Sequence, residues 1–335
     1  MKALISVTND IIRETFFTKE NTEYALSLGE IVWCKGRDET SEKEMKELIK
    51  DCDVYITCWE SPQLTEKILD CAPKLKLLTH LGSTVAPVAC PEVWERGIKV
   101  ISAFDYFSES TAEGAIAYIL AAQRNIPFYN HRLKKDKVWY KDGDTTDGLI
   151  TKTIGIISYG GVGRHMVKKL QPFNVKIKVY DIVDISEEEK QKYNMEQCSI
   201  EEIFSSCDII SVHSPYNDST YHMIDDRLFS MMKKNSLFVN TSRGPVVDQK
   251  ALTEHLKKGD FRAALDVYEK EPIDTDDPLL ELDNVVMLPH QGGVTTNLRS
   301  VLTRDLLTES RNFVDFGESL KNEVAKTYAV NMSKY

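Results

Sequence analysis

Short apolar runs alternate with stretches in which apolar residues recur at helical spacing over the first hundred residues. The helical stretches include residues 41–51 and 63–71. An alternation of this kind predicts a parallel β-sheet with helices on both of its faces. The runs with the length and composition of strands are 3–7, 30–34, 54–58, 77–80 and 99–102.

The pattern changes near residue 110. Ser110 and Glu113 have the spacing of a capping box, which predicts a long helix from residue 112 to about residue 125. A second alternating series follows a polar loop at 141–148, and apolar positions between 298 and 307 predict a final helix. The strands expected in the second series are 153–157, 176–180, 209–212, 237–240, 263–265 and 285–288. Both series predict an α/β protein built on parallel sheets whose strands are buried on both faces.

Composition narrows the classes of function. The 335 residues suffice for two domains with full cores, and 28% charged with 42% hydrophobic residues is usual for a soluble globular protein. The formal net charge of −10, without a long run of lysine or arginine, argues against nucleic acid as a partner.

Membranes and metals are disfavoured as well. No apolar run approaches the roughly 18 to 20 residues of a membrane span, and the N-terminus is too polar for a signal peptide. The seven cysteines are odd in number, scattered and without a CxxC pair. We therefore expect free thiols in a cytoplasmic protein, rather than a disulfide framework or a zinc site.

A glycine-rich segment follows the first strand of the second series. Residues 154–164 read IGIISYGGVGR, and the dinucleotide fingerprint G-x-G-x-x-G would need glycine at 158, 160 and 163. Ser158 takes the first place, which we expect to be tolerated if its backbone keeps a negative φ. We predict that a pyrophosphate lies on the backbone here, although a plain strand-to-helix turn is the alternative. The predicted cofactor-binding residues of this loop are Gly160, Gly161, Val162 and Gly163.

An acidic residue ends the next strand. Asp181 lies 18 residues beyond Gly163, near the place where a carboxylate binds the adenosine ribose hydroxyls. Ile182, Val183 and Asp184 come next, so a 2′-phosphate would meet two carboxylates and no arginine. This arrangement favours NAD over NADP as the cofactor.

Three further segments complete a recognisable order. They read NTSRGPVVD at 240–248, AALDVYEKEP at 263–272 and LPHQGG at 288–293. Together with the cofactor loop they resemble the D-isomer-specific 2-hydroxyacid dehydrogenases, and weaker likeness extends over nearly the whole chain. The resemblance implies a flavodoxin-like substrate domain, 1–104 plus 295–335, into which a Rossmann-type NAD-binding domain, 105–294, is inserted. It also implies a homodimer formed through the 110–140 region.

The resemblance also assigns roles to residues. Arg243 would anchor the substrate, His290 would be the acid or base, and Glu271 would support it. Gly82 and Ser83 would offer N–H groups to the substrate carboxylate, and His80 just before them is a further substrate-binding candidate. The implied cofactor-binding residues outside the loop and Asp181 are Ser214, Thr241, Ser242, Asp266, Gly292 and Gly293, with Asp266 facing the nicotinamide carboxamide.

Oxidation of a 2-hydroxyacid requires groups of these kinds, independently of the family resemblance. Removing hydride from C2 of a hydroxyacid requires a base beside the hydroxyl, and histidine titrates near neutrality. A carboxylate beside that histidine raises its pKa and orients it, and an arginine can pair with the substrate carboxylate or polarise the C2 carbonyl. The plainer alternatives are a surface arginine at 243, a charge beside a helix at 271 and, at 290, a histidine after a proline whose hydrogen bonds are satisfied within the protein.

Two departures from the family pattern blur the substrate. Thr84 stands where a second glycine is usual, and residues 103–110, AFDYFSES, are unusually aromatic. The leading hypothesis is an NAD-dependent enzyme that interconverts a D-2-hydroxyacid and its 2-oxo acid. The alternatives are an NAD(H)-sensing, corepressor-like binding protein on the same scaffold and a formate- or phosphite-type dehydrogenase.

Overall fold

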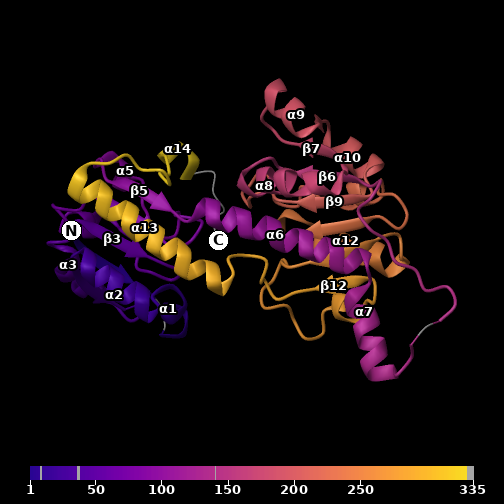
Figure 1. The fold of residues 1–335 in the computed structure, drawn as a ribbon, viewed down its shortest axis with the longest axis horizontal. Coiled ribbons are helices and arrows are strands. Elements are labelled where there is room, and N and C mark those ends of the chain that lie inside the picture. Colours follow the sequence, from indigo (N-terminus) through magenta and orange to yellow (C-terminus); the bar gives the residue numbers. More distant parts are fainter. Residues whose placement is uncertain (8–9, 36–37, 140, 330–335) are drawn as a thin grey trace. The chain divides into compact units, whose positions relative to one another are not determined.

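Each alternating series folds into a parallel sheet of its own in the computed structural model, which describes residues 1–7, 10–35, 38–139 and 141–329 (Figure 1). The chain divides into two compact units. Unit 1 comprises Met1–Phe107 with Val294–Tyr335, and unit 2 comprises Ser108–Gly293. The chain therefore leaves unit 1 once and returns to it once.

The sheet of unit 1 has five parallel strands in the order β2-β1-β3-β4-β5. This is the flavodoxin-like order, which confirms the predicted fold class. The predicted ranges 30–34, 77–80 and 99–102 match the observed strands. The predicted strand 3–7 is shifted by one residue, and 54–58 is one residue too long. The strands are β1 (Lys2–Ser6), β2 (Glu30–Cys34), β3 (Val54–Thr57), β4 (Leu77–His80) and β5 (Lys99–Ser102).

Helices cover both faces of this sheet because successive strand residues point to opposite sides. Leu4 of β1 packs in a core with α3 (Glu42–Ile49), α4 (Glu66–Leu69) and α5 (Glu92–Glu95). Its neighbours Ala3 and Ile5 pack in a second core on the other face. The helices of that second face are α1 (Asp10–Phe16), α2 (Lys19–Leu28) and α13 (Thr296–Phe316), and the short α14 (Lys326–Ala329) adds Ala329 to the first core.

The sheet of unit 2 has seven parallel strands in the order β12-β11-β10-β9-β6-β7-β8. The first strand of the unit, β6, lies between β7 and β9, so the strand order reverses there as in a Rossmann fold. In open α/β sheets ligands bind at the carboxyl ends of the strands beside such a reversal. The strands are β6 (Thr153–Ile157), β7 (Lys176–Tyr180), β8 (Met195–Gln197), β9 (Ile209–Val212), β10 (Leu237–Asn240), β11 (Arg262–Leu265) and β12 (Val285–Met287).

Two helical layers enclose this sheet. The later part of α6 (Phe104–Gln123) and α8 (Gly161–Leu170) share one core with residues such as Ile154 and Val179. The opposite core contains α10 (Ile200–Ser206), α11 (Asp226–Phe229) and α12 (Gln249–Lys258). The remaining helical elements are α7 (Ile126–His131), α9 (Glu187–Tyr193), a π-turn at Arg132–Asp136 and 3₁₀ turns at Gln171–Phe173, Gly244–Val246 and Pro278–Glu281.

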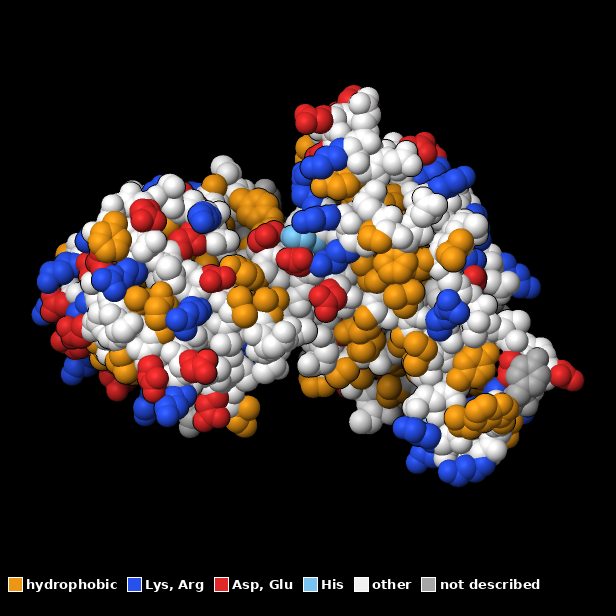
Figure 2. Space-filling model, viewed as in Figure 1, with side chains coloured by type: hydrophobic (Ala, Val, Ile, Leu, Met, Phe, Trp, Pro, Cys, Tyr) orange, Lys and Arg blue, Asp and Glu red, His pale blue; other side chains and the backbone are white. Residues whose placement is uncertain are grey.

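Exposed apolar side chains gather on the part of unit 2 that includes α7 and the segments after it (Figure 2). Trp139 is 84% exposed and Ile150 is 81% exposed. The others in this set are Ile126, Phe128 and Leu133. A cluster of this kind usually marks a contact surface.

The expected capping box at Ser110 is wrong. Helix α6 begins at Phe104, so Ser110 lies inside the helix, and its Oγ donates to the carbonyl of Gly293 at 2.9 Å. The three-residue strand β8 was not expected because its apolar run is too short to stand out. Among the helices of the described residues, none is both long and apolar enough to cross a bilayer.

Candidate active site

The turn after β6 has the shape of the dinucleotide fingerprint although its first residue is serine. Ser158 adopts φ 80°, so the expectation of a negative φ is wrong. This left-handed conformation is the one that glycine normally provides at the first position. A Cβ at Gly163 would lie only 2.2 Å from the Ser158 carbonyl oxygen, so helix α8 packs directly on the strand end. Two of the fingerprint's three mechanical functions are therefore visible in the backbone.

The carboxylate at the end of β7 is fixed by backbone N–H groups. Tyr159 donates to Asp181 Oδ2 at 2.6 Å, and Val183 donates to Oδ1 at 2.9 Å. Gln197 on β8 supports the same loop, because its amide bonds the carbonyl of Val183 and the N–H of Ile185. Asp181 thus presents a held carboxylate directly beside the glycine-rich turn.

An imidazole and a carboxylate pair near the ends of β11 and β12. His290 Nδ1 donates to Glu271 Oε2 at 2.6 Å, and the Tyr268 N–H donates to Glu271 Oε1 at 2.9 Å. Burial acts to raise the pKa of Glu271, but these hydrogen bonds together with the charges of His290 and Arg243 outweigh it and lower the pKa. His290 is exposed, and its Nε2 bonds no residue in the described ranges. The ring therefore offers one nitrogen to a ligand and the other to a carboxylate.

Asp266 holds the loop that carries His290. Its two carboxylate oxygens accept the N–H groups of Gln291 at 2.8 Å and Gly292 at 2.7 Å, and its carbonyl accepts the His290 N–H at 2.9 Å. The side chain is 1% exposed, and burial raises its pKa against the opposing effect of these N–H groups. His290 is thereby fixed to the end of β11, in a backbone conformation with φ 54°.

Arg243 lies on the loop after β10. Burial lowers the pKa of its guanidinium, and the charge of Glu271 opposes that shift. The next residue, Gly244, approaches the neighbouring loop so closely that a Cβ there would lie 1.8 Å from the carbonyl oxygen of Tyr268. The structure thus brings Arg243, Glu271 and His290 together at one edge of the unit 2 sheet.

Comparison with known proteins identifies the family. Residues 116–292 match the model of the D-isomer specific 2-hydroxyacid dehydrogenase, NAD binding domain. A glyoxylate reductase of Korarchaeum cryptofilum is 33% identical over 304 residues, which cover 90% of this chain and 89% of that protein. The chain belongs to the D-isomer specific 2-hydroxyacid dehydrogenases.

Other relatives of this dehydrogenase family carry different substrate names. A D-3-phosphoglycerate dehydrogenase of Methanocaldococcus jannaschii is 38% identical over 257 residues, which are 76% of this chain but 48% of that protein. The crystal structure of D-lactate dehydrogenase from Aquifex aeolicus with NAD and lactic acid has 25% identity and a TM-score of 0.71, covering 93% of this chain and 95% of that one. These matches identify the family, and the names of the relatives refer to different acids.

The residues of this dehydrogenase fit a nicotinamide dinucleotide. Two buried polar atoms, His213 Nδ1 and Thr241 Oγ1, have no hydrogen-bond partner among the described residues. They follow β9 and β10, which are adjacent, so both lie at the carboxyl edge where such a cofactor binds. No described side chain caps the start of α8, and Gly160 leaves open space there. NAD(P) is the cofactor class of the family, and these groups are where it would find partners.

His213 cannot be a charged ligand at neutral pH. Its Nε2 lies 3.0 Å from Ser211 Oγ, and burial lowers its pKa to about 3. Ser214 and Ser242, which the sequence singled out, are buried beside it at 5% and 8% exposure. Ser242 Oγ is already used, because it donates to Asn240 Oδ1 at 2.8 Å.

Two residues of the site were missed from the sequence. Asn240 ends β10 and accepts from the Ser242 N–H while donating to the Arg243 carbonyl, so it shapes the loop that carries the arginine. Tyr268 donates through its hydroxyl to the Leu288 carbonyl at 2.9 Å and thus joins the two loops of the His290–Glu271 pair. Asparagine at a strand end is a turn signal that could have been noticed, whereas nothing local marks Tyr268.

The remaining predicted residues belong to unit 1. His80 is 3% exposed, its Nδ1 lies 2.9 Å from Thr57 Oγ1, and burial lowers its pKa to about 4. Its Nε2 would be 2.4 Å from a Cβ at Gly82, so the ring lies against the backbone of the Gly82–Ser83 loop. Binding of substrate by these residues stays a prediction.

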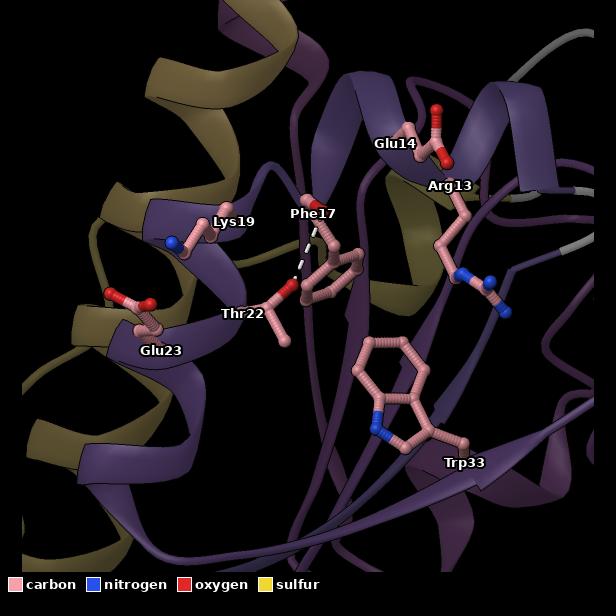
Figure 3. Close-up of a pocket in the computed structure, with 7 residues that line it drawn as sticks. All are labelled: Arg13, Glu14, Phe17, Lys19, Thr22, Glu23 and Trp33. Carbon is pink, nitrogen blue, oxygen red and sulfur yellow. Dashed lines mark hydrogen bonds between the residues drawn. The ribbon is translucent and has the colours of Figure 1, made fainter.

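Unit 1 also carries an open groove that contains none of the predicted site residues. Its walls come from the α1–α2 region and from β2, and Thr22 donates to the Phe17 carbonyl at 3.2 Å (Figure 3). The Arg13 guanidinium lies 5.9 Å from the centroid of the Trp33 ring. Charges of both signs line this surface, so it selects no particular ligand.

Among the described residues, no group of histidine, cysteine, aspartate or glutamate side chains could hold a metal ion. All seven cysteines are described, and each is a free thiol.

Proposed function

We propose that this protein is an NAD-dependent enzyme that interconverts a D-2-hydroxyacid and its 2-oxo acid. The observation that carries the proposal is the His290–Glu271 pair beside the half-buried Arg243. In this proposal unit 2 binds the cofactor and unit 1 contributes to binding of the acid. When bound, NADH supplies the hydride that reduces C2 of the oxo acid.

His290 is the proton donor in reduction and the proton acceptor in oxidation. Its Nδ1–H is directed at Glu271, so Nε2 is the atom that exchanges a proton with the C2 oxygen. The hydrogen bond to Glu271 holds the ring in one orientation. Glu271 is therefore a positioning residue that acts through His290.

Arg243 binds the substrate. An arginine side chain binds anions through charge-assisted hydrogen bonds, and the guanidinium of Arg243 lies close enough to Glu271 for their charges to interact. The carboxylate of a 2-oxo acid is such an anion and can form two parallel hydrogen bonds with arginine. In unit 1, the backbone N–H groups of Gly82 and Ser83 are proposed to bind substrate, as the family resemblance implies.

NAD is the proposed form of the cofactor. Asp181 is held beside the turn at 158–163, where it can accept both ribose hydroxyls and repel a 2′-phosphate. Ile182 and Val183 are 90% and 67% exposed and form an apolar surface suited to the adenine ring. The other proposed cofactor contacts are those predicted at Gly160, Gly161, Val162, Gly163, Ser214, Thr241, Ser242, Asp266, Gly292 and Gly293.

A homodimer is proposed through the apolar surface around α7. The exposed side chains there belong to the region through which the family resemblance implies dimer formation. A second copy of the same surface would cover Trp139 and Ile150, which otherwise face water. Sedimentation of the wild type and of Trp139→Lys tests this, because the lysine variant should shift toward monomer.

The test of the activity is a panel of 2-oxo acids with NADH and NADPH in parallel, followed by cofactor absorbance. Glyoxylate and hydroxypyruvate head the panel because relatives are named for their reduction. Turnover with at least one acid and NADH is expected. Tight NADH binding without turnover of any acid would instead favour the sensing protein.

A further inference from the structure

Tyr159 contacts both an arginine and Asp181, the acid from which the sequence predicts a preference for NAD. Arg164 is in the first turn of α8 and its guanidinium lies 4.5 Å from the centroid of the Tyr159 ring. The backbone N–H of the same Tyr159 donates to Asp181 Oδ2 at 2.6 Å. One residue therefore positions both the ribose-binding carboxylate and an arginine.

That arginine is neutralised by a carboxylate from the next helix. Arg164 Nη1 pairs with Glu189 Oε1, and the Tyr159 hydroxyl donates to the same oxygen at 3.3 Å. Glu189 lies in the first turn of α9, which follows the loop that Asp181 begins. The three side chains form a cluster between the glycine-rich turn and the 181–186 loop, and we call it the Tyr159 cluster.

The exposure of the cluster leaves the guanidinium within reach of a ligand. The Arg164 side chain is 54% exposed, while Tyr159 is 4% exposed and its ring packs against the guanidinium. An arginine that stacks on an aromatic ring and keeps its N–H groups toward solvent is suited to binding phosphate. Within the described part of the chain, the carboxylate that pairs with it is that of Glu189.

We propose that the Arg164–Glu189 ion pair is a second determinant of cofactor choice, in which Glu189 blocks a guanidinium that would otherwise bind the 2′-phosphate of NADP(H). This inference rests on the proposed use of NAD and on the proposed role of Asp181. It adds that Asp181 alone does not set the preference for NAD over NADP. The guanidinium of Arg164 could bind phosphate, and its charge is paired with Glu189.

The inference is tested by binding of NADPH and NADH to variants, measured by calorimetry rather than by turnover. In an Asp181→Asn background, Glu189→Gln should tighten NADPH binding about tenfold, near the lower end of what one charge-assisted hydrogen bond contributes. NADH binding should stay nearly unchanged. Adding Arg164→Gln should abolish the gain, because the guanidinium is the group that was released.

A matched control comes from an equivalent ion pair elsewhere in unit 2. Arg227 pairs with Glu201 at 3.1 Å on the surface, so Glu201→Gln removes the same charge without touching the Tyr159 cluster. It should leave the ratio of NADPH to NADH affinity as it was. Thermal melting of each variant confirms that the fold is retained.

The outcomes separate this inference from the function on which it rests. Suppose that the wild type binds NADH but that, in the Asp181→Asn background, Glu189→Gln leaves NADPH affinity unchanged. The ion pair then has no part in selectivity, and the same follows if the gain in NADPH affinity survives Arg164→Gln. If the wild type binds neither cofactor, the proposed function fails and this inference with it.

Discussion

Two imidazole–carboxylate pairs lie on the surface of unit 2, and they look alike at first sight. His290 pairs with Glu271, and His222 pairs with Glu269, two residues away in the chain. Both histidines have positive φ, 54° and 48°, and all four side chains are between 31% and 47% exposed. Pair geometry and exposure alone do not mark a proton-transfer site.

The surroundings of the two pairs differ. His290 uses Nδ1 for its carboxylate, on a loop fixed by the buried Asp266, and Glu271 lies close enough to Arg243 for each charge to affect the other's pKa. His222 uses Nε2, and its ring stacks 4.0 Å from that of the exposed Tyr221. A half-buried cation nearby and a loop fixed by backbone hydrogen bonds are what distinguish the candidate site from a surface ion pair.

The largest effect should follow replacement of His290. In His290→Ala, kcat for 2-oxo acid reduction should fall roughly 10² to 10⁴-fold, the usual contribution of positioned proton transfer. NADH affinity should be retained, because the imidazole acts on substrate. Steady-state kinetics and calorimetry measure the two quantities, and loss of NADH affinity would place His290 in cofactor binding instead.

Replacement of Glu271 should have the next largest effect. Glu271→Gln keeps a hydrogen-bond acceptor near His290 but removes the charge, so kcat should fall about a hundredfold, the low end of such contributions. A lowered pKa in the folded state also stabilises the protein above the ordinary glutamate value of about 4.3.

That stabilisation is lost as the pH falls through the lowered pKa. Urea unfolding between neutral and acidic pH should therefore show a smaller acid-side loss of stability in Glu271→Gln than in the wild type. Equal losses in the two proteins would mean that Glu271 is not held as a carboxylate in the folded state.

Ser158 has a positive φ, as His290 and His222 do, so the cost of that backbone conformation can be tested there. Ser158→Gly should raise the free energy of unfolding by about 1 kcal/mol, because a Cβ is unfavourable in this backbone region. NADH affinity should be unchanged. Asn194→Gly, at φ 48° after α9, is a control with a smaller expected gain because asparagine tolerates this conformation. Denaturant unfolding measures both, and equal gains would remove any special strain at Ser158.

The smallest effect is expected at the second pair. His222→Ala should change kcat/KM by less than about threefold, since substitutions at exposed positions are typically worth no more than about 0.5 kcal/mol. The same panel assay measures it. A loss comparable to that of His290→Ala would end the distinction drawn between the two pairs.

Most of the fold could be predicted because its strands are buried on both faces. Runs such as Ile209–Val212 and Leu237–Asn240 carry no polar alternation, so their limits are visible in the sequence. The start of α6 could not be read in this way. The capping pattern at Ser110 is local, whereas the helix is extended by packing of Phe104 and Ala112 in separate cores.

The candidate site was predictable in its side chains and not in its supports. Arg243, Glu271 and His290 follow strand ends in the order that the family pattern implies. Asp266 was expected to face the cofactor, and its grip on the 290–292 backbone depends on a fold that brings residues 25 positions apart into contact. The predicted sign of φ at Ser158 was wrong, because the identity of one residue does not determine its φ.

The bond from Ser110 Oγ to the Gly293 carbonyl joins the beginning of unit 2 to its last residue, and Gly114 approaches Gly292 closely one helical turn along. The two ends of the inserted segment therefore lie close together. A domain of this kind is suited to insertion into another protein or to circular permutation, because a short linker can join its ends.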